Sequence, residues 1–239
     1  MSASLAIAEL KSFGRKSRIS DIARFYKTGP GEYGEGDLFL GGTVPETRSV
    51  AKKYQALELL EIEKLFNSPF HEARLCAAII LNLQFKVAKT FQERKKLFDF
   101  YMKQVRAERI NNWDIVDVSA PWMGVYLTEV EDPMPLLIKL AKSKSLWQRR
   151  VSMILTFALI RKGDLEPTII IAQSLLKDDQ DLIHKAVGWM LRELGKRDVM
   201  MLRRFLSEHA HEMPRTMLRY SIEKLPERER KNWLLESKS

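Results

Sequence analysis

Three segments of the chain decide its fold: HEARLCAAIILNL (residues 71–83), WQRRVSMILTFAL (147–159) and IHKAVGWMLREL (183–194). Each segment places a basic residue just ahead of an apolar helix. Arg149 and Lys185 lie 36 residues apart, and Arg74 precedes Arg149 by 75 residues, which is about two such periods. A helix that begins at Trp113 fills the gap, 39 residues after Arg74.

A period near 36 with two helices per unit predicts an all-α, HEAT-like helical-repeat solenoid, formed as a single domain over residues 1–239. Because each unit contributes the same helix to the inner curve, the solenoid is expected to be curved, with one concave face. Basic residues that recur once per unit would line this face and follow a phosphate backbone. For any single residue, a solvated helix face is the simpler interpretation. The recurrent residues are Arg74, Arg149, Arg150, Lys185, Arg203, Arg204, Arg215 and Arg219.

The composition is that of a folded, basic protein. The 239 residues are 45% hydrophobic, which disfavours disorder, and 11 Gly and 9 Pro are too few for a chain of many short strands and turns. Forty Lys and Arg against 31 Asp and Glu give a net charge of +9. That surplus favours a polyanion such as nucleic acid as partner, although basic solubility alone would also produce it.

Several classes of protein are disfavoured. Cys76 is the single cysteine and cannot form an internal disulfide, no secretory signal precedes the polar N-terminal region, and no apolar run reaches the roughly 18 residues that span a bilayer. The four His residues lack a third ligand at metal spacing, and there is no phosphate-cradling Gly motif of the P-loop or dinucleotide type. We expect a cytoplasmic monomer that uses no metal or cofactor and contacts no membrane.

The N-terminal region combines two short helices with a long loop. Residues 2–27 read as two helices broken around Gly14 to Ser17, and Thr28 to Arg48 carries six Gly and two Pro, which predicts an ordered loop. Phe39 and Leu40 are expected to pin the end of this loop to the core. From Pro45 onward the chain reads as successive helices, with breaks near 67–69, 108–112, 131–135, 142–145, 162–164, 177–179, 196–198, 213 and 226.

The most unusual local sequence is NNWDIVDVSAPW, residues 111–122. One of the two Asn residues is a suitable N-cap, and Asp114 then falls in the first turn, where the helix dipole favours a carboxylate. Asp117 lies in an otherwise apolar stretch and shares a helix face with Trp113, four residues earlier. An aromatic plane beside a carboxylate can stabilise a developing positive charge, although a structural role remains the simpler interpretation. Trp189 follows Gly188, which would allow another group to approach closely, so the two indoles are candidates to flank one pocket.

Four motifs resemble those of the AlkD-like DNA alkylation repair glycosylases, which are built from HEAT-like repeats. They are GEYGEGDLFLGGTVPETR (31–48), NNWDIVD (111–117), LWQRR (146–150) and IHKAVGWMLRE (183–193). They follow the family's order across about residues 20–195, and the last is the most specific.

The resemblance implies hydrolysis of the N-glycosidic bond of N3- or N7-alkylated purines in double-stranded DNA, within base excision repair. It implies Asp117 as the catalytic carboxylate, Trp113 and Trp189 as the aromatic pair beside the sugar, and Arg150 as a contact to the DNA backbone. The position that is Tyr in some members is Phe25 here, with Tyr26 adjacent. Further candidate DNA contacts are Arg149, Lys185, Phe25, Tyr26, Arg48 and Arg74.

Two other functions fit the same features. The first is a non-catalytic DNA-binding relative that recognises distorted or bulky-adduct DNA, against which the presence of Trp113, Asp117, Arg150 and Trp189 argues. The second is a HEAT-type protein-interaction scaffold, against which the recurrent basic residues argue.

Overall fold

The computed structural model describes residues 1–236, and these form α-helices, one 3₁₀-helix and the loops between them. The contacts divide the chain into two compact units, one from Met1 to Met123 and one that begins at Gly124. The single domain expected over residues 1–239 stays a prediction. No helix in the described part of the chain is long and apolar enough to cross a membrane.

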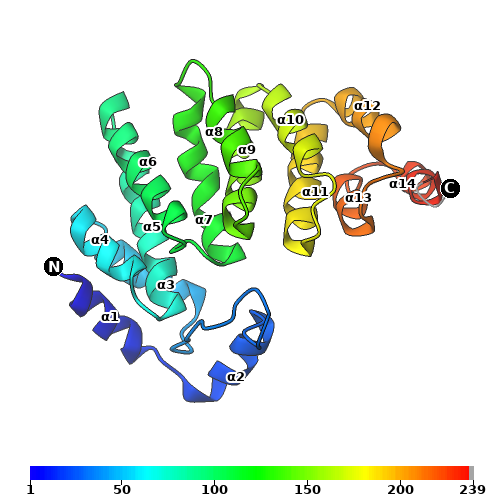
Figure 1. Cartoon of the computed structure of the whole chain (residues 1–239). Coiled ribbons are helices and arrows are strands. Elements are labelled where there is room, and N and C mark those ends of the chain that lie inside the picture. The colour runs from blue at the N-terminus through cyan, green and yellow to red at the C-terminus, as the bar shows by residue number, and fades with distance from the viewer. Residues whose placement is uncertain (237–239) are drawn as a thin grey trace. The chain divides into compact units, whose positions relative to one another are not determined.

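The first unit is organised around one long helix, α5. Its helices are α1 (Ala3–Ser12), α2 (Lys16–Phe25), α3 (Val44–Lys53), α4 (Leu59–Phe66), α5 (His71–Val87), α6 (Phe91–Arg106) and α7 (Trp113–Met123). Most of α5 is buried because α1, α3, α4, α6 and α7 all pack against it. Figure 1 shows α4, α5 and α6 side by side.

The second unit continues the pattern of paired helices. Its elements are the 3₁₀-helix η1 (Gly124–Thr128), α8 (Met134–Ala141), α9 (Leu146–Lys162), α10 (Glu166–Ser174), α11 (Asp181–Gly195), α12 (Val199–His209), α13 (Arg215–Ser221) and α14 (Glu227–Glu236). Helix α11 packs between α9 and α13. From α5 onward, alternate helices begin at residues 71, 113, 146, 181 and 215, which are 42, 33, 35 and 34 residues apart. The helical breaks and the approximate period predicted from the sequence are confirmed.

The predicted loop is ordered, and α3 begins at Val44, one residue before the helix start predicted at Pro45, so the last residues of the Thr28 to Arg48 segment belong to this helix. The Thr43 hydroxyl accepts a hydrogen bond from the Glu46 N–H while the Glu46 carboxylate accepts one from the Thr43 N–H. This capping box, with a proline in the first turn, starts the helix at Val44. The breaks at 54–58 and 88–90 were not predicted, although Thr90 and Glu93 carry the same signature ahead of α6.

The end of the loop is tied to the start of α5, as Phe39 and Leu40 predicted. Phe39 is buried, and the His71 N–H donates to the Leu38 carbonyl at 2.8 Å. Gly41 has a φ of +89°, and a side chain there would meet the Arg15 carbonyl oxygen at 2.3 Å. Glycine is therefore required where the loop passes the start of α2.

Candidate active site

The candidate site is built at the start of α7, where NNWD begins a helix. The Asn112 side-chain oxygen accepts a 2.8 Å hydrogen bond from the Trp113 N–H, and Asp114 Oδ1 accepts one of 2.8 Å from the Ile115 N–H. The first N–H groups of a helix have no backbone carbonyl to donate to, and these two side chains supply acceptors for two of them. Trp113 and Asp117 project from the same face of α7, and both are half-buried.

An aromatic wall of four side chains, Phe25, Tyr26, Phe39 and Trp113, forms around the indole. The Tyr26 ring stacks on Trp113 with centroids 5.6 Å apart and on Phe39 at 5.2 Å, with interplanar angles of 20° and 24°. Phe25 meets Trp113 edge to face at 5.8 Å. Since Phe25 is 64% exposed, the aromatic wall reaches solvent. The wall thus brings together three residues that the sequence nominated, Phe25, Tyr26 and Trp113.

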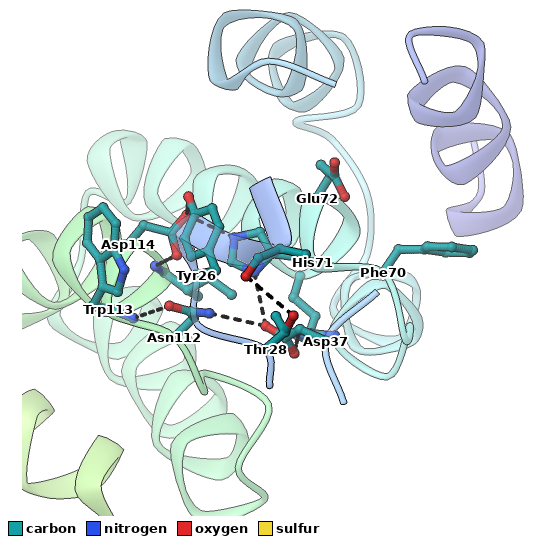
Figure 2. A network of polar contacts seen from close by, with 12 residues as sticks. Tyr26, Thr28, Asp37, Phe70, His71, Glu72, Asn112, Trp113 and Asp114 are labelled. Atoms are coloured by element: carbon teal, nitrogen blue, oxygen red, sulfur yellow. Dashed lines mark hydrogen bonds and ion pairs between the residues drawn. The ribbon is translucent and has the colours of Figure 1, made fainter. Parts of the chain in front are cut away.

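A polar network joins the aromatic wall to the loop (Figure 2). His71 Nε2 lies 2.9 Å from Asp114 Oδ2, and His71 Nδ1 lies 3.3 Å from Asp37 Oδ2. The Tyr26 hydroxyl donates to the same Asp114 oxygen at 2.9 Å. Asn112 Nδ2 donates to Asp37 Oδ2 at 3.1 Å. Two carboxylates, one from the loop and one from α7, therefore share an imidazole between them.

Two further residues of α5 anchor the loop. The Arg74 guanidinium pairs with Asp37 and donates to the Ser68 carbonyl at 2.9 Å. The Glu72 carboxylate accepts hydrogen bonds from the backbone N–H groups of residues 40 and 41, at 3.0 and 2.9 Å. Arg74, a predicted DNA contact, therefore has its partners inside the protein and is only 5% exposed.

The network changes the acidity of its members. Burial alone would lower the pKa of His71, but Asp114 and then Asp37 outweigh it and raise that pKa to about 9. Burial opposes ionisation of Asp37, yet the hydrogen bond from His71 and the charge of Arg74 hold the pKa of this carboxyl below its usual value. Burial and the Asp114 carboxylate raise the pKa of Tyr26 far above its ordinary value. At neutral pH the imidazole is cationic, and the phenol keeps its proton.

Asp117 lies one turn beyond Trp113. Burial, and to a smaller extent the charge of Asp117, raises the pKa of Tyr101, whose hydroxyl accepts a 3.3 Å hydrogen bond from Ser119. The charge of Asp117 therefore influences the pKa of the buried Tyr101, while Asp117 itself is only half-buried.

A cavity of about 570 Å³ lies beside the aromatic wall. Helix α2, none of whose residues is buried, forms one side, and the starts of α3 and α5 form the other. The residues that line it include Phe25, Tyr26, Phe39, Thr43, His71 and Glu72.

The remaining candidate residues lie in the second unit, apart from Arg48, which is exposed on α3. Arg149 pairs with Asp178 at 2.5 Å, and Lys185 pairs with Asp181 at 2.7 Å. Arg150 is 4% exposed and donates to the Leu182 carbonyl.

Trp189 is half-buried on α11, with its ring 6.1 Å from that of Phe157. The close approach expected beside it is present, since a side chain at Gly188 would meet the Met217 carbonyl oxygen at 2.5 Å. The pairing of Trp189 with Trp113 and the contacts of the basic residues with DNA stay predictions.

The N-cap expected from one of the two Asn residues is Asn112, which directly precedes α7 and accepts the Trp113 N–H. The sequence did not reveal the bond of Asn112 to Asp37 or the roles of Asp37 and His71. Asp37 lies inside the Gly-rich motif and His71 opens the first of the three deciding segments, but neither position indicates in the sequence that the two side chains meet. Across residues 1–236, no group of three or more His, Cys, Asp or Glu side chains is arranged to hold a metal ion.

The chain belongs to the family described as DNA alkylation repair enzyme, whose model matches residues 6–225. No curated protein matches the chain. A solved structure described as a predicted DNA alkylation repair enzyme from Enterococcus faecalis is similar, with a TM-score of 0.69 and 16% identity, over 90% of this chain and 97% of that one.

A second solved structure comes from a family described as related to the HEAT-like repeat DNA glycosylases, with affinity for branched DNA structures. It aligns with a TM-score of 0.55 and 14% identity, over 89% of this chain and 83% of that one. At these identities the likeness concerns the fold, and the all-α, HEAT-like class predicted from the period is confirmed. The protein is thus an all-helical member of a DNA alkylation repair family.

Proposed function

We propose that the protein is a DNA glycosylase that hydrolyses the N-glycosidic bond of cationic N3- or N7-alkylated purines in duplex DNA. The observation that carries this proposal is the arrangement on α7, where Trp113 and Asp117 share one partly open face and Phe25 and Tyr26 pack on the indole. Membership of the DNA alkylation repair family supports the same class of substrate.

The chemistry fits an arrangement that offers a carboxylate and aromatic rings. Alkylation at N3 or N7 makes the purine cationic, so the base leaves without a general acid. The sugar then develops oxocarbenium character, which Asp117 would stabilise by its charge and Trp113 and Trp189 by cation–π attraction. Asp117 would also orient the attacking water. In this proposal the protein acts as a cytoplasmic monomer and needs no metal or cofactor.

The DNA contacts proposed here divide into two groups by exposure. Arg48 and Phe25 are exposed, and Arg149 and Lys185 are half-buried with acidic partners that a phosphate would displace. Tyr26, Arg74 and Arg150 each have a partner inside the protein, so a contact of theirs with DNA would form in addition to these internal contacts or in exchange for them.

The decisive experiment measures release of N7-methylguanine from a methylated duplex by the native protein and by Asp117→Asn. We expect base release by the native protein and a loss of about a hundredfold or more in the variant, because a preorganised charge is removed from the transition state. Asp99→Asn is the matched control, since Asp99 is exposed on α6 and pairs with Lys95. No release by the native protein would overturn the enzymatic proposal, and equal release by both would remove Asp117 from its role.

The second candidate function is non-catalytic binding of branched DNA, the property named for the relative with a TM-score of 0.55. Binding of a four-way junction and of an alkylated duplex, compared at one salt concentration, separates the two functions. Tighter binding of the junction without base release would favour the second.

A further inference from the structure

Two routes of contacts lead from Asp37 in the loop to the first turn of α7 (Figure 2). In the first, Asp37 accepts from the Asn112 side chain, whose oxygen accepts in turn from the Trp113 N–H. In the second, His71 lies between Asp37 and Asp114. The loop therefore reaches both the backbone of Trp113 and the residue that follows it.

The second route ends on the face of the indole. Asp114 accepts the Tyr26 hydroxyl at 2.9 Å, and the Tyr26 ring stacks on Trp113 at 5.6 Å. The contacts thus form a closed ring through Asp37, Asn112, Trp113, Tyr26, Asp114 and His71. Each of these six residues contacts two others of the ring. The orientation of the Trp113 indole therefore depends on polar contacts that it does not make itself, those of Asp37 with His71 and Asn112 and of His71 with Asp114.

The imidazole in this ring must carry both protons. A neutral imidazole donates from one nitrogen only, so its other nitrogen would face a carboxylate lone pair with a lone pair of its own. The cation donates to both Asp37 and Asp114. The other charged or titratable groups around it are Arg74 and Glu72 on α5 and the Tyr26 phenol at the end of α2. The two cations, His71 and Arg74, pair with the two carboxylates Asp37 and Asp114. The third carboxylate, that of Glu72, is buried and accepts hydrogen bonds from backbone N–H groups of the loop.

We propose that Asp37 and His71 are positioning residues for Trp113: the imidazolium joins the loop carboxylate to Asp114, and Asp114 holds Tyr26 against the indole. The Gly-rich loop is then a fixed part of the active site, although it contributes none of the groups that would touch the sugar. This inference rests on the glycosylase function proposed above for its consequences on rate.

The first test follows Trp113 directly and does not depend on activity. Protein labelled with 5-fluorotryptophan gives one ¹⁹F resonance for each of its five Trp, and Trp113→Phe identifies the relevant one. Asp37→Asn and Tyr26→Phe should shift or broaden the Trp113 resonance and leave the others in place. Tyr54→Phe is the matched control, because the Tyr54 hydroxyl donates to Glu9 outside the ring of contacts. If Asp37→Asn does not fold, Tyr26→Phe alone decides, since it removes a single oxygen.

The second test observes the imidazole. The ¹⁵N shifts of the His71 side chain, assigned with His71→Gln, should show two protonated nitrogens at pH 7.5 in the native protein and a lower pKa in Asp114→Asn. A neutral His71 at pH 7.5 would overturn the proposal.

The third test concerns rate. At saturating protein, the single-turnover rate constant for base release should fall about tenfold or more in Asp37→Asn, while affinity for the duplex changes less than about threefold, because misplacing a reacting group affects the chemical step more than binding. Tyr54→Phe should keep the native rate.

An unchanged Trp113 resonance in Asp37→Asn and Tyr26→Phe, together with an unchanged rate in Asp37→Asn, would refute the positioning role. If the native protein releases no base, the glycosylase function fails, and the ¹⁹F and ¹⁵N measurements still decide whether Asp37 and His71 orient Trp113.

Discussion

Trp113 and Trp189, the two indoles proposed to act together, are held in different ways. Trp113 stands on the first turn of its helix, where a loop and a buried imidazole fix its surroundings through charges and hydrogen bonds. Trp189 lies within α11 beside Gly188, where α13 approaches so closely that a methyl group would not fit. The orientation of Trp113 should therefore respond to protonation, and that of Trp189 to side-chain volume.

The largest expected effect is of pH on the first unit. His71 ordinarily has a pKa of 6.5 and here has one of about 9, so its stabilising contribution is complete below pH 6.5 and is lost as pH rises through 9. The loss should be on the order of 3 kcal/mol of unfolding free energy. Urea unfolding at pH 6 and pH 10, followed by the ¹⁹F resonance of Trp113, measures it. His71→Gln should show a much smaller change, and an equal change in the variant would contradict the prediction.

The second effect tests the packing that holds Trp189. Gly188→Ala should destabilise the second unit by about 2 kcal/mol, because the new methyl group would lie 2.5 Å from both the Met217 carbonyl oxygen and the Tyr220 Cβ. Urea unfolding followed by the Trp189 resonance gives the value. Gly42→Ala is the control, since its nearest new contact is Phe13 Cβ at 4.0 Å. Equal stability of the two variants would show that α13 moves away at little cost.

The same contrast explains what the sequence was able to reveal. That Trp113 and Asp117 share one helix face was predicted because an i, i+4 spacing is visible in the sequence, whereas their catalytic roles were implied by the resemblance to the family. The close approach at Gly188 was predicted because glycine inside an apolar helix has few other uses. The helical repeat was also visible, because a spacing near 36 residues can be recognised in the sequence without knowing which side chains are in contact.

The network behind Trp113 was not visible, because its partners are brought together only by folding. His71 lies 34 residues from Asp37 and 43 from Asp114. Arg74 was interpreted as a groove-facing cation from its place ahead of an apolar helix, yet its acidic partner lies 37 residues earlier in the loop. A basic residue at a recurring position marks the repeat, and the structure of each unit determines what that residue contacts.

In the second unit, Arg150 tests whether a basic residue at a recurring position contacts DNA or only the interior of the protein. Arg150→Ala should cost about 1.5 kcal/mol of unfolding free energy, because the Leu182 carbonyl loses its charged donor. If Arg150 also contacts a phosphate, the slope of log affinity for duplex DNA against log salt should become less steep by about 0.9. Denaturation and binding at four salt concentrations give both values. A loss of stability with an unchanged slope would assign Arg150 to the interior alone.

Arg48 provides the smallest expected effect on stability and the cleanest measure of DNA contact in the first unit. Its side chain is exposed on α3 and outside the ring of contacts around Trp113, so Arg48→Ala should change the unfolding free energy by less than about 0.5 kcal/mol. The salt slope should nevertheless become less steep by about 0.9, because one phosphate contact releases about one counterion. Lys64→Ala, which removes an exposed cation from α4, is the control and should leave the slope unchanged. Equal slopes for Arg48→Ala, Lys64→Ala and the native protein would mean that DNA does not reach α3, and that the first unit meets its substrate through the aromatic wall without this basic residue.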